Sequence, residues 1–75
     1  MEPNIHTLKG YQKRKKTQIR AYEWVMSILA IKRAAHAGEE AGNAIADIEN
    51  AIGHQISTEV AELKSIESDI ERLSV

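Results

Sequence analysis

The stretch from residue 21 to residue 31 constrains the fold most, because as a helix it is apolar on two opposite sides. At about 100° per residue, one of its faces carries Tyr22, Val25, Met26 and Leu29. The face nearly opposite carries Trp24, Ile28, Ile31 and Ala35. A helix that is apolar on nearly all sides is normally covered on nearly all sides. This segment therefore needs more than one packing partner.

The chain has 75 residues, which is enough for one domain but near the lower limit for folding alone. It contains no cysteine for disulfides, and its histidines do not form a zinc-binding pattern. We therefore expect it to gain stability as a homo-oligomer, with a dimer as the simplest form. The lack of cysteine is compatible with a reducing compartment, and we expect a cytoplasmic protein.

Composition and turn signals predict a single all-α domain over residues 1–75, an antiparallel hairpin of two long helices. Ala, Ile, Glu and Lys dominate, and the single proline is Pro3. Asn4 and Thr7 are alternative N-caps for the first helix, and Gly38 is expected at its C-terminal end. We predict an irregular arm over residues 1–6, a first helix over 7–37, a turn over 38–43 and a second helix over 44–73.

One continuous helix is the alternative fold, because two glycines in a helix cost only about 1 kcal/mol each. Such a helix would be a rod of roughly 90–100 Å at 1.5 Å per residue. The charge pattern favours the hairpin. Residues 1–38 hold eight Lys/Arg and two acids, a net charge of +6, whereas residues 39–75 hold two Lys/Arg and nine acids, a net charge of −7. The sign of the charge thus inverts where glycine and asparagine cluster.

The second helix has a single apolar stripe at spacings of three and four, so it has one side to bury. The step of eleven residues from Ile45 to Ile56 predicts a local change in supercoil, and the stripe beyond it follows coiled-coil heptads. The predicted hairpin core consists of Tyr22, Val25, Met26, Leu29, Ile45, Ile48, Ile52, Ile56, Val60 and Leu63.

A hairpin can cover only one of the two apolar faces of its first helix. The other face, Trp24, Ile28, Ile31 and Ala35, is the predicted interface for a second copy or another protein. Two hairpins that bury this face against each other would form a four-helix bundle.

The start of the first helix is basic and supplies candidate contacts to nucleic-acid phosphates. These candidates are Lys9, Lys13, Arg14, Lys16 and Arg20. An alternative explanation is pairing within the hairpin, because antiparallel helices would bring residues 9–20 beside residues 60–71, which contain four acids. The two explanations are compatible, because residues 13–16 span all sides of a helix.

No catalytic motif is present in the sequence, so we expect no enzymatic activity, no metal and no cofactor. No uncharged apolar run reaches 18 residues, so we expect no membrane span. The leading prediction is a small oligomeric interaction protein (an adaptor, inhibitor or regulator) that binds another macromolecule. The alternative is a regulator that binds RNA or DNA. The sequence does not identify the partner.

Overall fold

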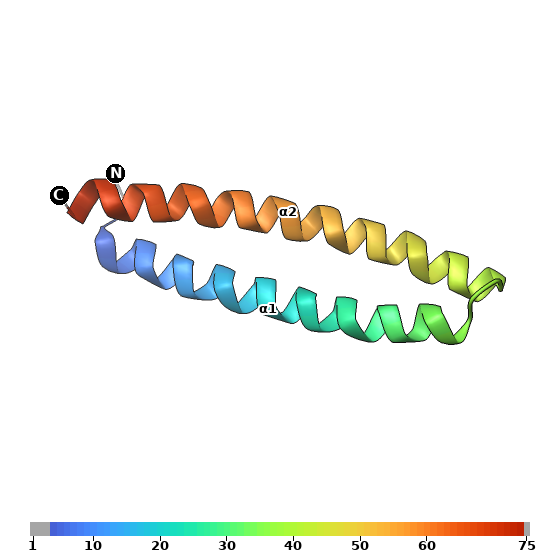
Figure 1. The fold of residues 1–75 in the computed structure, drawn as a ribbon. Coiled ribbons are helices and arrows are strands. Elements are labelled where there is room, and N and C mark those ends of the chain that lie inside the picture. The colour runs from blue at the N-terminus through green and yellow to red at the C-terminus, as the bar shows by residue number, and fades with distance from the viewer. Residues whose placement is uncertain (1–3, 75) are drawn as a thin grey trace.

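The computed structural model describes residues 4–74 and contains two long helices, α1 (Ile5–Ala35) and α2 (Glu40–Ser74). The helices run antiparallel and side by side along their whole length, so the start of α1 and the end of α2 lie at the same end (Figure 1). The hairpin measures 54 × 18 × 15 Å. The prediction of an all-α helical hairpin is confirmed, and the alternative of one continuous rod is wrong.

Asn4 begins α1 as its N-cap. Its backbone is extended, and its Oδ1 accepts hydrogen bonds from the Thr7 amide at 2.9 Å and the Thr7 hydroxyl at 3.2 Å. This cap satisfies a backbone donor, the Thr7 amide, that would otherwise lack a partner. The helix therefore starts at Ile5 instead of residue 7. The rest of the predicted arm, residues 1–3, lies outside the described residues.

The turn occupies only residues 36–39, so α1 ends two residues earlier than predicted and α2 begins four residues earlier. His36 caps α1, and its carbonyl oxygen accepts a hydrogen bond from the Glu39 amide at 3.0 Å. Gly38 lies two residues beyond this cap with a φ of +82°, a left-handed conformation that favours glycine. Gly42 is buried in the first turn of α2, where a Cβ atom would overlap the His36 carbonyl oxygen. Gly42 thus allows the His36 carbonyl to lie close to the α2 backbone, and it does not interrupt the helix.

The two helices meet along a line of half-buried and buried residues at alternating spacings of three and four, which we call the seam. On α1 the seam contains Ile5, Leu8, Gln12, Lys15, Ile19, Tyr22, Met26 and Leu29. On α2 it contains Ile45, Glu49, Ile52, Ile56, Glu59, Leu63, Ile66 and Ile70. Both lines follow the heptad spacing of a coiled coil.

The apolar core of the hairpin is thin. Leu8 and Ile19 are the buried apolar side chains within residues 4–74, and neither was in the predicted core. The predicted core residues of both helices are half-buried, with the exception of Ile48. Ile48 is 49% exposed, because Glu49 takes the seam position between Ile45 and Ile52. Within the eleven-residue step from Ile45 to Ile56, the seam keeps spacings of three and four, and an acid fills the gap in the apolar stripe. The predicted local change in supercoil stays a prediction.

We predict that Gly42→Ala destabilises the hairpin, because the added methyl group overlaps the turn backbone. The expected loss is about 1–3 kcal/mol in the free energy of unfolding, measured by urea denaturation. Gly53→Ala is the matched control, since its Cβ would meet nothing within 4 Å. That change should stabilise the helix by roughly 0.5–1 kcal/mol. A Gly42→Ala variant as stable as the parent chain would contradict the assigned role of Gly42.

Candidate functional site: the surfaces and the seam of helix α1

The outer strip of α1, which consists of Trp24, Ile28, Ile31 and Ala35, lies on the side of the helix away from α2. Trp24 is 68% exposed, Ile31 is 70% exposed and Ile28 is 37% exposed. Trp24 lies about half a turn from Tyr22 and from Met26, which both belong to the seam. The described hairpin therefore does not cover the outer strip, which is the face that the sequence predicted as an interface.

Charged side chains occupy the middle of the seam. The Lys15 ammonium donates hydrogen bonds to the carboxylates of Glu59, at 2.6 Å, and Glu62. Glu59 is only 7% exposed and also accepts a hydrogen bond from Gln55 at 2.9 Å. A buried carboxylate is costly unless it is paired and hydrogen-bonded, and both conditions hold for Glu59.

These contacts shift the pKa values of both partners in the direction that favours the charged forms. The hydrogen bond from Lys15 lowers the pKa of Glu59, against the opposing effect of burial, and Gln55 adds to the lowering. The pKa of Lys15 is raised, chiefly by its hydrogen bonds to Glu59 and Glu62. Both groups are therefore charged at neutral pH.

Further polar contacts join the two helices on either side of this pair. The Gln12 amide donates to Glu67 at 2.9 Å, and the Lys16 ammonium lies 4.0 Å from the same carboxylate. Nearer the turn, the Arg33 guanidinium pairs with Glu49. The basic start of α1 thus lies beside the acidic end of α2, as the alternative explanation of the basic tract requires.

The pairing leaves one side of α1 basic. Lys15 points into the seam, whereas the spacing of Lys9, Lys13, Lys16 and Arg20 places these four cations on another side of the helix. We call these four residues the basic side, and all of them are exposed. A shallow hollow of about 310 Å³ is lined by Gln12, Lys13, Lys16, Thr17 and Arg20. Arg14, the fifth candidate nucleic-acid contact, lies away from this side.

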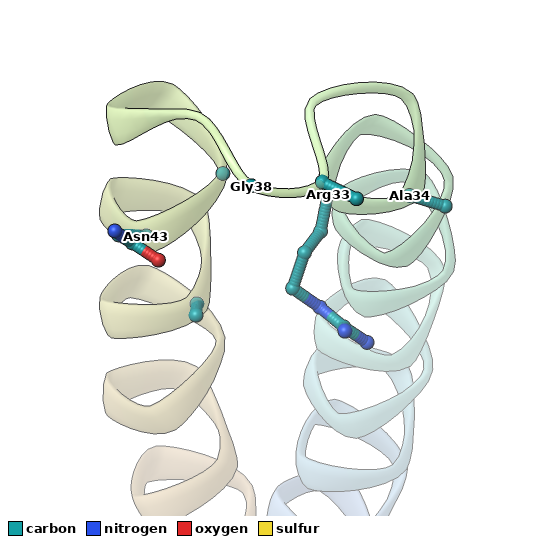
Figure 2. Close-up of a pocket in the computed structure, with 7 residues that line it drawn as sticks. Arg33, Ala34, Gly38 and Asn43 are labelled. Carbon is teal, nitrogen blue, oxygen red and sulfur yellow. The ribbon is translucent and has the colours of Figure 1, made fainter.

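A second hollow, of about 330 Å³, lies beneath the turn. It is lined by Arg33, Ala34, Ala37, Gly38, Gly42, Asn43 and Ala46. Figure 2 shows Arg33 and Ala34 on one helix and Asn43 on the other, with Gly38 in the connection between them. Most of these side chains are small, and Arg33 is engaged by Glu49. The hollow follows from the small residues that form the turn.

The residues described contain no cluster of three His, Cys, Asp or Glu side chains that could hold a metal ion. The Nδ1 atom of His36 lies 2.8 Å from a carboxylate oxygen of Glu39, a contact at the end of α1. Neither α1 nor α2 is long and apolar enough to cross a membrane.

No protein-family model, curated protein or solved structure matches the chain. The roles proposed for these surfaces therefore rest on the residues and contacts of this chain.

Sequence reasoning missed that acids occupy seam positions. Glu49 and Glu59 interrupt the apolar stripe of α2, so a search for apolar residues alone passes over them. The signal was available in the spacing, because a heptad extended back from Ile70 and Leu63 meets Ile56 and Glu49. On α1, Lys15 lies seven residues from the buried Leu8 and from the half-buried Tyr22.

We predict that Glu59→Gln lowers the stability of the hairpin at neutral pH and that the deficit shrinks in acid. A carboxylate with a lowered pKa stabilises the fold above its unfolded pKa, and this contribution is lost as the pH falls through the folded value. The difference between the variant and the parent should therefore be larger at about pH 7 than at about pH 3, measured by urea denaturation. Glu71→Gln is the control, since Glu71 is exposed and forms no ion pair within residues 4–74. An equal deficit at both pH values would contradict the pairing.

Proposed function

We propose that this chain is a non-enzymatic, oligomeric interaction protein (an adaptor, inhibitor or regulator) that assembles through the outer strip of α1 and binds another macromolecule. The observation that carries the proposal is the exposure of Trp24 and Ile31 on the side of α1 that α2 does not cover. Exposed tryptophan and isoleucine side chains grouped on one face are typical of a protein-interaction surface. A cytoplasmic location remains part of this proposal, and its support is the absence of cysteine.

The energetics of the hairpin support an occupant for this strip. Burial of a large apolar side chain is worth about 1.5–3 kcal/mol, and the strip contains three of them. Within the described residues the hairpin buries just two apolar side chains, Leu8 and Ile19, and it places charged groups in its seam. A domain with so thin a core gains most from further apolar burial.

A second copy of the chain is the simplest occupant of the strip. Every copy presents the same strip, and a twofold interface requires a surface that is complementary to itself. A macromolecular partner would then bind the assembled form through the surfaces that remain free.

We predict that the chain elutes as a dimer at micromolar concentration in size exclusion with light scattering. Ile31→Ser should weaken the dimer at least tenfold, because each copy loses apolar burial worth more than 1.4 kcal/mol. Ile48→Ser is the matched control, since Ile48 is also exposed but lies on α2. A well-folded monomer at these concentrations would contradict the proposal of self-association.

Nucleic-acid binding is the second candidate function, and the basic side of α1 favours it. Lys9, Lys13 and Arg20 form no ion pair within the described residues, and Lys16 has one distant carboxylate at 4.0 Å. A line of exposed cations beside a polar hollow is suited to contact the phosphates of RNA or DNA. The four acids of residues 60–71 reduce the attraction, which makes this function the second candidate.

We predict for this second candidate that any mobility shift with RNA or DNA weakens with salt. The log–log slope should be about −0.7 to −0.9 for each phosphate contacted. Reversal of Lys13 and Lys16 to Glu should abolish the shift while the hairpin stays folded by circular dichroism. Reversal of Lys64 and Arg72 on α2 is the control and should leave the shift in place. The absence of a shift with both nucleic acids at low salt removes this function.

A further inference from the structure

We infer that the outer strip is a twofold interface in which α1 packs antiparallel against α1 of a second copy. This inference rests on the proposed self-association and adds its geometry. Three features of the described chain support it: the spacing of the strip, the placement of charge along α1, and the position of the strip relative to the seam.

The spacing of the strip matches itself when one copy is reversed. Exposed Thr17 and Ala21 continue the strip toward the start of α1, and the six residues then alternate at steps of four and three. In an antiparallel pair Trp24 lies against Ile28 of the second copy, and Ala21 lies against Ile31. Thr17 then lies against Ala35, so each residue of the strip meets another residue of the strip. Small side chains thus face an isoleucine or each other, and the tryptophan packs on an isoleucine.

The charge along α1 selects the antiparallel orientation. In a parallel pair Lys13 and Arg14 would lie beside the same cations of the second copy, which is repulsive. In the antiparallel pair these cations lie beside Glu39 in the turn of the second copy and Glu40 at the start of its α2. Glu39 is well exposed, so its carboxylate is accessible to a neighbouring molecule. The residue at the middle of the interface is Ser27, which is uncharged.

The position of the strip also sets the shape of the dimer. The strip and the seam lie on opposite sides of α1, so the helix that covers the strip cannot also touch α2. The two copies of α1 therefore lie in the middle, and the two copies of α2 lie outside them. The result is a row of four helices, which differs from the closed four-helix bundle that the sequence suggested.

Nitroxide spin labels on single cysteines test this arrangement, because the chain has no cysteine of its own. Gly10→Cys places a label on an exposed position near the start of α1 with open space around it. In the antiparallel dimer the two labels should lie about 50 Å apart, at 1.5 Å of rise per residue. In a parallel dimer they should lie about 10 Å apart, the spacing of packed helices, before the length of the label linkers is added. Ser27→Cys is the matched control and should give a short distance in either orientation.

A long distance for Gly10→Cys with a short one for Ser27→Cys is the expected result. Short distances for both variants would overturn the antiparallel inference and leave self-association through the strip intact. A long distance for Ser27→Cys would mean that the copies meet elsewhere, and it would overturn both the inference and the assigned role of the strip. A monomer in light scattering would likewise overturn both.

Discussion

The ion pair between Lys15 and Glu59 is the interaction on which the register of the hairpin depends. Apolar contacts are tolerant of sliding, since one isoleucine layer resembles the next. A nearly buried carboxylate is not tolerant, because a shift by one turn would leave it beside Gln12 or Ile19 without a counter-charge. Arg33 and Glu49 repeat the arrangement nearer the turn. The two pairs together align the helices at the middle of the seam and near the turn, whatever their net effect on stability.

The two sides of α1 are built from the same periodic pattern but differ in chemistry. The seam mixes apolar residues with charges, which is suited to fixing one partner in one position. The outer strip is apolar without interruption from Trp24 to Ala35, and such a surface is suited to the burial of apolar area against a partner. Hence α2 covers the side on which charge selects the register, and the side with the greater apolar content stays exposed in the single hairpin.

Much of the fold could be predicted from residue type and spacing, because both helices have helical periodicity and the turn has two glycines. The uncovered face of Trp24 and Ile31 followed from the same periodicity. The boundaries at the turn could not be predicted, since Gly42 stands inside a helix for a reason that only the neighbouring His36 carbonyl reveals. The charged seam positions were missed for a similar reason. A lysine or glutamate in a helix is normally read as solvent-exposed, and its burial becomes evident only when its partner on the other helix is placed.

The two-sided use of α1 has a consequence for how this sequence can vary. Nearly every position from Tyr22 to Ala35 lies in the seam, in the outer strip or between them, so few substitutions there are independent of packing. The far side of α2, with Asn50, His54 and Ser57, is exposed in the hairpin that residues 4–74 form. The exposed side of α2 should therefore tolerate substitutions, fusion tags and new binding specificities. Substitutions in α1 are more restricted, because most of them alter packing.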